Sequence, residues 1–344
     1  MSVAADPELA QLASELPDIE GLIVRRLRLP DDAGALASLS NRAQEADDID
    51  ERETAEDWER WLTMTNGLDL ATGVVVAALE GAMVAYAQAR WTDDNDGGRN
   101  YGTMGIVEPE LRGRGIGGAL LRHNERRLRL IAAGHDPLLE KRLESWTYDS
   151  ETLRISLLET AGYAAVRYFF DMLRPALDEI PDLPLPPGLE IRPVRPDQYR
   201  QIWEADTEAF RDHWGGMDTS EKSFTRHFSG PNFRPELWRV AWEGDEVAGV
   251  VANEILTAYN QASGQRRGLL AGVSVRRPWR GRGLARALVA DSLRALRDAG
   301  MTSATLGVDA ENPTGALGVY EATGFRVANK GRTYRKPLMA GDAG

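Results

Sequence analysis

RGRGIGGALL at residues 112–121 and RGRGLARALV at residues 280–289 are two copies of one segment rich in arginine and glycine. In each copy, apolar residues at helical spacing follow the glycines, so we expect a helix to begin there. Glycine lets the backbone come close to a ligand, and the first N–H groups of a helix have no partner inside it. Because these groups carry partial positive charge, each copy predicts a cradle for an anion such as a pyrophosphate. The alternative is a flexible turn with solvated arginines, and a second copy at a matching place argues against it.

The two segments belong to a longer internal repeat. GLIVRRLRLPDD at residues 21–32 has a counterpart in GLEIRPVRPDQ at residues 188–198, and LLETAGYAAV at residues 157–166 has one in VYEATGFRVA at residues 319–328. Since the landmarks recur in the same order at nearly constant spacing, a duplicated domain is the best interpretation. The stretch between the halves, RPALDEIPDLPLPPG, is rich in proline and is typical of a linker.

The repeat sets the predicted domain boundaries. We expect an N-terminal extension at residues 1–20, a first domain at 21–175, a linker at 176–188, a second domain at 189–338 and a tail at 339–344. Within each half, a strand, helical stretches, a hairpin and a short apolar strand precede the cradle, and a helix, a strand, a helix and a final strand follow it. This order predicts an α/β domain built twice.

Composition narrows the function classes. The formal net charge is −12, which argues against a nucleic-acid partner, since phosphate contacts need clustered Lys and Arg. The acidity keeps the protein in solution or, alternatively, favours cationic substrates. There are no cysteines, which excludes disulfides and a thiol nucleophile and fits the cytoplasm. The four histidines have no metal-ligand spacing, and no apolar run is long enough for a membrane span, so we expect no metal and no membrane partner.

A dinucleotide site is the first alternative for the cradle. GRGIGG at residues 113–118 matches the G-x-G-x-x-G pattern of nucleotide-binding α/β proteins. The match is weak, because the second copy has Arg286 at the third glycine position. The polar stretch AGHDPLLEKRLES, residues 133–145, also stands where such a fold would have its next strand.

A second pattern fits both copies. Arg112-x-x-Gly115-x-Gly117 and Arg280-x-x-Gly283-x-Ala285 resemble the acetyl-CoA loop of the GCN5-related N-acetyltransferases. The stretch LGVDAENPTGALGVYEATGF, residues 306–325, is similar to that family's strand, Asn, helix, Tyr and Gly-Phe ending. The resemblance covers nearly all of both halves. It implies two tandem domains of this family, each a mixed, mostly antiparallel sheet flanked by helices, with acetyl-CoA held between two diverging strands.

The resemblance implies cofactor-binding residues in both halves. In the second half these are Val273, Ser274, Val275, Arg280, Gly281, Arg282, Gly283, Leu284, Ala285 and Asn312. In the first half they are Ile106, Val107, Arg112, Gly113, Arg114, Gly115, Ile116 and Gly117. A backbone N–H of the strand before the cradle would polarise the thioester carbonyl. Asn312 would bond the pantetheine arm or, alternatively, cap the helix that follows.

The resemblance also implies catalytic residues. Tyr320 stands where the family has the tyrosine that protonates the sulfur of the coenzyme, and its ordinary pKa of about 10 suits that role. Glu254 is the candidate general base, and Asp309, Glu311 or a chain of water molecules are alternatives. In the first half, Leu158 takes the place of Tyr320, so that half keeps the cradle without the acid.

The expected acceptor site is the segment AFRDHWGGMD, residues 209–218. There Phe210, Asp212, His213 and Trp214 either shape a pocket or form a packed loop. In the first half, Ser150 falls near the position of Asn312.

We therefore expect an N-acetyltransferase that moves an acetyl group from acetyl-CoA to a primary amine of a small molecule, with the second domain catalytic. An acceptor on a protein N-terminus or lysine, a non-catalytic acyl-CoA sensor or scaffold, and a dinucleotide oxidoreductase remain as alternatives. Acceptor pockets are built from loops that vary within a fold, so the sequence does not name the amine.

Overall fold

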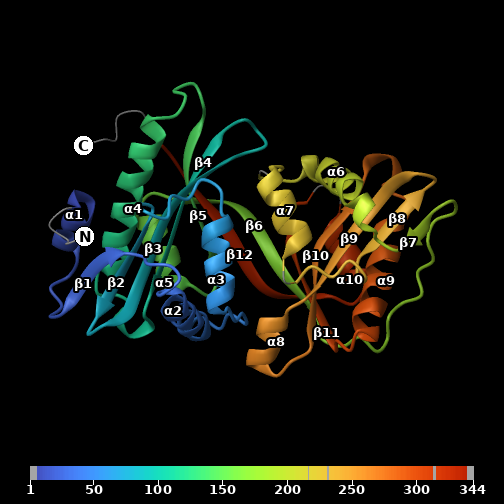
Figure 1. The fold of residues 1–344 in the computed structure, drawn as a ribbon, viewed down its shortest axis with the longest axis horizontal. Coiled ribbons are helices and arrows are strands. Elements are labelled where there is room, and N and C mark those ends of the chain that lie inside the picture. The colour runs from blue at the N-terminus through green and yellow to red at the C-terminus, as the bar shows by residue number, and fades with distance from the viewer. Residues whose placement is uncertain (1–5, 216, 231, 313–314, 339–344) are drawn as a thin grey trace. The chain divides into compact units, whose positions relative to one another are not determined.

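The computed structural model describes residues 6–215, 217–230, 232–312 and 315–338 (Figure 1). The chain divides into two compact units. Unit 1 consists of Met1–Arg167 together with Gly331–Gly344, and unit 2 consists of Tyr168–Lys330. The predicted tail at residues 339–344 lies outside the described residues.

Unit 1 is built on a mixed, mostly antiparallel sheet in the order β1-β2-β3-β4-β5-β12. Its strands are β1 (Leu22–Arg26), β2 (Val74–Leu79), β3 (Ala82–Asp93), β4 (Arg99–Val107), β5 (Lys141–Tyr148) and part of β12 (Arg326–Pro337). Its helices are α1 (Pro7–Glu15), α2 (Ala33–Ala46), α3 (Ala55–Met64), α4 (Ile116–Ala133) and α5 (Thr152–Thr160).

The hairpin β2–β3 shows how the sequence produces this sheet. Its two-residue turn is Glu80-Gly81, with φ values of 52° and 86°, the pair of positive values that suits the twist of an antiparallel hairpin. Successive side chains of a strand point to opposite faces of the sheet, so neighbouring valines of β2 pack on different helices. Val75 packs among residues of α1 and α4, whereas Val74 and Val76 pack among residues of α2 and α3. The sheet is therefore covered by helices on both faces, as α4 and α3 show in Figure 1.

Unit 2 repeats the plan with the order β6-β11-β10-β9-β8-β7. Its strands are part of β6 (Ala164–Arg174), β7 (Glu190–Arg192), β8 (Arg239–Glu243), β9 (Glu246–Ile255), β10 (Arg267–Val275) and β11 (Ser303–Asp309). Its helices are α6 (Tyr199–Ala209), α7 (Glu221–Ser229), α8 (Thr257–Ser263), α9 (Leu284–Asp298) and α10 (Ala316–Ala322). One face of the sheet packs on α9 and α10, and the other packs on α6.

In both units, two parallel strands separate after a short stretch of pairing. β4 pairs with β5 only from Arg99 to Gly102, although β4 continues to Val107. β10 pairs with β11 only from Arg267 to Leu269, although β10 continues to Val275. Each unit therefore has an opening in its sheet at the end of the strand that leads into the cradle.

The last strand of each half of the sequence lies in the sheet of the other unit. Residues 331–337 of β12 pair antiparallel with β5 in unit 1, and residues 169–174 of β6 pair antiparallel with β11 in unit 2. This exchange is the reason why the compact units differ from the domain boundaries expected at 21–175 and 189–338. Among the described residues, no helix is long and apolar enough to cross a membrane.

Candidate functional site

The two cradles have the same backbone geometry. A short 3₁₀ turn, Pro109–Leu111 or Arg277–Trp279, follows the strand, and α4 or α9 begins after the second glycine. The φ values are 75° and 96° at Gly113 and Gly115, and 75° and 87° at Gly281 and Gly283. These values lie in the left-handed region, which glycine adopts at little cost. Apart from the adjacent residues, no described part of the chain comes within 4 Å of the Cβ that any of these four glycines would carry, so the space before each cradle is open.

The arginine that opens each cradle anchors the loop to its own unit. Arg280 donates from Nε to the carbonyl of Val275 at 2.9 Å, from Nη1 to Asp212 at 2.7 Å and from Nη2 to the carbonyl of Ala209 at 3.1 Å. These contacts join the end of β10, the end of α6 and the cradle, and they leave little of the guanidinium for a ligand.

Arg112 makes the same three kinds of contact in unit 1. It donates to the carbonyl of Val107 at 3.2 Å, to Asp47 at 2.7 Å and to the carbonyl of Ala43 at 3.3 Å. Arg112 and Arg280 therefore anchor their loops in the same way, each through an aspartate and two carbonyl groups of its own unit. The anchor is a feature of the fold of each unit.

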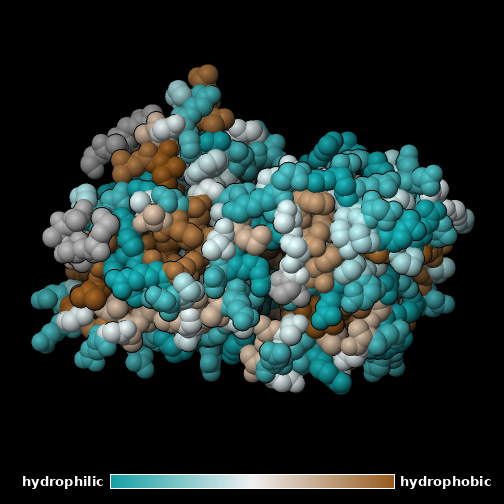
Figure 2. Space-filling view, viewed as in Figure 1, coloured by the Kyte–Doolittle hydropathy of each residue, from teal (hydrophilic) through white to brown (hydrophobic). Residues whose placement is uncertain are grey.

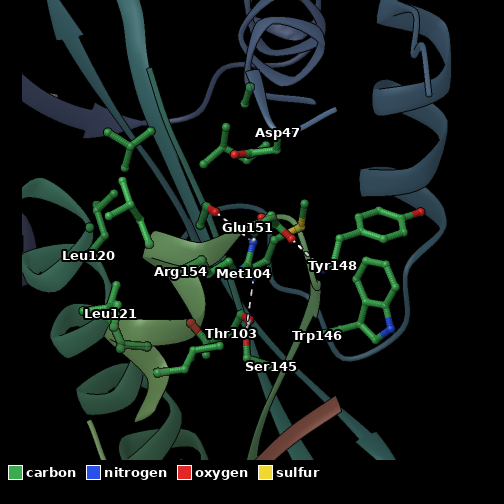
Figure 3. Close-up of a pocket in the computed structure, with 18 of the residues that line it drawn as sticks. Asp47, Thr103, Met104, Leu120, Leu121, Ser145, Trp146, Tyr148, Glu151 and Arg154 are labelled. Atoms are coloured by element: carbon green, nitrogen blue, oxygen red, sulfur yellow. Dashed lines mark hydrogen bonds and ion pairs between the residues drawn. The ribbon is translucent and has the colours of Figure 1, made fainter. Parts of the chain in front are cut away.

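A cavity of about 790 Å³ opens at the cradle of unit 1. The residues expected to bind the cofactor that line it are Ile106, Val107, Arg112, Gly113, Gly115 and Gly117. Arg114 is exposed, and Ile116 is buried in the core beneath the cradle. In Figure 3, Leu120 and Leu121 of α4 border the cavity opposite Trp146 and Tyr148 of β5, and Arg154 of α5 reaches between them.

The residues of unit 2 that we expect to bind the cofactor fall into two groups, those exposed at the cradle and those packed in the core. Gly281 and Gly283 are exposed at the cradle, Leu284 is buried, Ala285 is half-buried on α9, and Val273 and Val275 pack against the core. Arg282 is exposed and donates to the carbonyl of Pro187 at 3.2 Å. Asn312 lies in the segment between β11 and α10, and it does not cap that helix, because the N-cap residue is Gly315.

Tyr320 lies on α10, the helix that follows β11, and packs in the core of unit 2. It is buried next to Phe325, and burial raises the pKa of its hydroxyl to about 12. The hydroxyl makes no hydrogen bond with the described residues, yet it is not shut off from solvent. A neutral tyrosine with a free hydroxyl is chemically suited to donate a proton.

Two carboxyl groups lie on the opposite face of the same sheet. Burial raises the pKa of Glu254 on β9, against a weaker effect of a hydrogen bond from Asn232. Asp206 on α6 is buried as well, and burial raises its pKa to about 6. Asp206 accepts a hydrogen bond of 2.5 Å from Ser274 Oγ, which places it against the strand that leads into the cradle.

The segment expected to form the acceptor pocket is partly a structural element. Asp212 pairs with both Arg277 and Arg280, and the hydrogen bonds from these arginines hold its pKa well below the ordinary range. The ring of Trp214 lies 6.0 Å from that of Phe169, and the ring of Phe210 lies 5.6 Å from that of His213.

Unit 1 lacks the tyrosine. Leu158 occupies on α5 the position that Tyr320 occupies on α10, four residues before a glycine with positive φ in each unit, Gly162 or Gly324. Leu158 lines the cavity and is buried. Ser150 also lines the cavity.

Two regions of the chain, residues 35–135 and 197–325, match the sequence model of the acetyltransferase (GNAT) family. This chain belongs to the GNAT acetyltransferase family. Each matched region includes one cradle, and the tandem GNAT arrangement expected from the repeat is confirmed. The expected fold class, mixed and mostly antiparallel sheets flanked by helices, is confirmed as well.

Similar proteins support the same assignment. A mycothiol acetyltransferase from Streptomyces bingchenggensis is 30% identical over 75% of this chain and 77% of that protein. The crystal structure of a GCN5-related N-acetyltransferase from Sphaerobacter thermophilus has a TM-score of 0.72 and 29% identity, over 95% of this chain and 98% of the other. A tandem GNAT protein from the clavulanic acid biosynthesis pathway shares the fold at 17% identity, with a TM-score of 0.64 over 93% of this chain. The chain is therefore an N-acyltransferase of the GNAT family.

The residues of this GNAT protein fit an acyl-CoA. The open space at the four glycines can hold a pyrophosphate next to the positively polarised first turns of α4 and α9, and the separated strands can hold an extended pantetheine arm. Sequence reasoning missed Asp206 and the pairing of Asp47 with Arg112. No local pattern identifies either one, because each partner is more than sixty residues away along the chain.

Proposed function

We propose that this chain transfers an acetyl group from acetyl-CoA to a primary amine of a small molecule, and that unit 2 carries the reaction. The observation that supports unit 2 is the pairing of an open cradle at Gly281 and Gly283 with Tyr320, whose hydroxyl has no hydrogen-bond partner among the described residues. Unit 1 has an equivalent cradle with Leu158 in place of the tyrosine.

Acyl transfer to an amine needs a neutral amine, a donor for the developing oxyanion and a proton for the leaving thiolate. Acetyl-CoA supplies the activated thioester. Beyond Leu269, no described strand pairs with β10 on its β11 side, so alternate backbone N–H groups of residues 270–275 point into the opening and can donate to the thioester oxygen. Tyr320 gives its proton to the departing sulfur.

The amine loses its proton on the opposite face of the sheet. We assign this step to Glu254, whose raised pKa favours uptake of a proton. Asp206 is the second candidate, since its pKa of about 6 is closer to the working range of a general base and its hydrogen bond to Ser274 holds it at β10. In the proposal, unit 1 binds an acyl-CoA without turnover or serves as a scaffold.

The acceptor class follows from the family and the open site. Several relatives are named mycothiol acetyltransferase. The compound that those enzymes acetylate is therefore one acceptor to include in a screen. We expect the segment at residues 209–218 to contact the acceptor, with Phe210 and Trp214 as apolar walls.

The test is a titration of acetyl-CoA followed by turnover with a panel of primary amines. The acceptor of the mycothiol acetyltransferases, a thiol compound, is followed by the mass of its acetylated product. The other amines of the panel contain no thiol. Because the chain has no cysteine, a thiol-specific reagent detects only the released coenzyme A. Asp and Asn both tolerate positive φ, so Gly283→Asp and Gly283→Asn form a pair that differs mainly in charge.

We expect Gly283→Asp to abolish turnover, Gly283→Asn to retain part of it, and Gly115→Asp to leave it intact. Turnover that is lost with Gly115→Asp and kept with Gly283→Asp would move the reaction to unit 1. Binding without turnover of any amine would favour the acyl-CoA sensor.

A further inference from the structure

The cavity of unit 1 extends to the α2 and α3 side of the sheet, well beyond the cradle. Between the ends of β4 and β5 it passes from the face covered by α4 and α5 to the opposite face, where Arg90 of β3 and Glu53 from the segment before α3 line it. These two side chains carry opposite charges, and neither is used by the acyl-transfer proposal.

Among the described residues, the guanidinium of Arg90 makes no hydrogen bond and no ion pair. It lies across Gly102, whose missing side chain leaves space in front of it, with Arg90 Cγ 3.6 Å from the Cβ that Gly102 would carry. The charge of Glu144 raises the pKa of Arg90, but the Glu144 carboxylate already forms an ion pair with Arg335 at 2.9 Å. Burial lowers the pKa of Arg90, as expected for a cation without a counter-ion.

The carboxylate of Glu53 has only neutral partners. Ser40 Oγ donates to it at 2.7 Å and Gln44 Nε2 donates at 3.2 Å, and in the described part of the chain no cation pairs with it. The oxygen of the same amide, Gln44 Oε1, is a buried acceptor with no donor among the described residues. Burial raises the pKa of Glu53. Both donors bond to Oε2 of Glu53, and among the described residues no donor reaches its Oε1. This free carboxylate oxygen and Gln44 Oε1 are suited to receive an ammonium group.

Other charged groups of the lining are satisfied within unit 1. Asp47 pairs with Arg112 at 2.7 Å and Glu151 pairs with Arg154 at 3.4 Å. Arg90 and Glu53 do not pair with each other. The charge of Glu53 raises the pKa of the Tyr86 hydroxyl and the charge of Arg90 lowers it, so both groups lie on the side of the cavity near Tyr86. An unpaired charge inside a protein is costly unless a ligand neutralises it, so two of opposite sign in one cavity fit a ligand that carries both signs.

The remaining wall is apolar and aromatic. Ile49, Met104, Trp61, Trp146 and Tyr148 line the cavity, and the rings of Trp146 and Tyr148 meet edge to face at 4.4 Å (Figure 3). In the space-filling view, apolar side chains reach the surface of unit 1 between α3 and α4 (Figure 2). Such a wall favours an apolar side chain on the ligand.

We infer that the unit 1 cavity binds an apolar amino acid, with its carboxylate on Arg90 and its ammonium group on Glu53 and Gln44. The inference concerns binding alone and does not depend on which unit catalyses acetyl transfer. It assigns to unit 1 a ligand of its own in addition to the cradle.

The first test uses the full wild-type chain and three probes of one skeleton. L-Phenylalanine carries both charged groups, 2-phenylethylamine only the amine, and 3-phenylpropanoate only the carboxylate. By calorimetry we expect L-phenylalanine to bind at least about tenfold more tightly than either single-charge probe, and L-leucine to bind as well. No binding of either amino acid, or equal binding of the three probes, would overturn the inference without any variant being made.

The second test assigns the groups. Arg90→Met should weaken L-phenylalanine by about tenfold or more and leave 2-phenylethylamine unchanged, whereas Glu53→Gln should weaken L-phenylalanine and leave 3-phenylpropanoate unchanged. Arg60→Met and Glu56→Gln, on α3 outside the lining, are the matched controls. Thermal melts of every variant check the fold. Unchanged binding of L-phenylalanine to a folded Arg90→Met variant would refute the assignment.

Discussion

Arg280 donates to the carboxylate of Asp212 at 2.7 Å, and Arg112 of unit 1 makes the same contact with Asp47 at the same distance. In both units the guanidinium also bonds the last carbonyl of the strand before the cradle. The arginine of the decapeptide thus ties the loop to the strand and to the preceding helix. The glycines can hold their positive φ values next to open space because this anchor fixes the loop around them.

This anchor predicts that Arg280→Lys weakens acetyl-CoA binding in unit 2 by about tenfold, because a lysine cannot make three divergent hydrogen bonds. Calorimetric titration measures the loss. Arg297→Lys is the matched control, since Arg297 is exposed in the last turn of α9, away from the cradle, and pairs with the neighbouring Asp298. Full affinity in Arg280→Lys, or an equal loss in Arg297→Lys, would mean that the anchor does not govern the cradle.

Removal of the Tyr320 hydroxyl should affect turnover and leave stability unchanged. Loss of a general acid typically lowers a rate by about 10² to 10⁴, and we expect Tyr320→Phe to lower kcat within that range with an unaltered KM for acetyl-CoA. The hydroxyl has no hydrogen bond to lose, so the midpoint of thermal unfolding should stay the same. Tyr199→Phe, on α6 of the same unit, is the control. A kcat close to that of wild type would require another proton donor for the thiolate.

Local patterns in the sequence predicted the elements that local chemistry determines. The hairpin around Glu80-Gly81 and the two cradles follow from glycine, alternation and helical spacing, and the structure has them at the expected places. The order of elements predicts a strand at the place of β5, but its residues were not identified, because residues 133–145 look polar and the first residues of β5 alternate between charged and apolar side chains. Its end, Trp146 to Tyr148, contributes to the cavity.

Distant partners could not be predicted. Nothing in the sequence of β12 shows whether it pairs within its own half or with the other half. Only its pairing with β5 assigns it to unit 1. The same holds for Arg90 and Glu53, since the sequence shows two charges among many and only the fold shows that neither is paired. Pairing partners that are far apart in sequence leave no periodic signal for a single chain to reveal.

The exchanged strands predict that the two halves do not fold well apart. A chain that ends after residue 175 lacks residues 331–337, so β5 becomes an unpaired edge, and such an edge promotes aggregation. We expect the separate pieces 1–175 and 176–344 to melt broadly or aggregate, and to recover a sharp transition when produced together. Circular dichroism and gel filtration measure both.

A matched control keeps every strand in place. A protease site introduced into the linker at residues 176–188 and then cut leaves both exchanged strands available, so the cut chain should melt like the intact one. Sharp melting of each separate piece would show that the strand exchange is dispensable for folding.

Asp206 should make the protein less stable as pH rises. In the unfolded chain its pKa is near 3.8, and in the native state burial raises it to about 6. Between these values the native state binds more protons than the unfolded state, so the free energy of unfolding falls as pH rises toward about 6 and then levels off. A shift of this size corresponds to about 3 kcal/mol as an upper value.

Asp206→Asn isolates this effect, because the amide oxygen still accepts from Ser274 Oγ and does not titrate. In urea unfolding near neutral pH, we expect the variant to be more stable than wild type by up to about 3 kcal/mol, and the difference to disappear below about pH 4. Glu204→Gln, an exposed change on the same helix, should show no such dependence. A wild type that is more stable than Asp206→Asn near neutral pH would mean that the native site favours the charged carboxylate, and Asp206 would then be better placed to stabilise a cationic amine than to accept its proton.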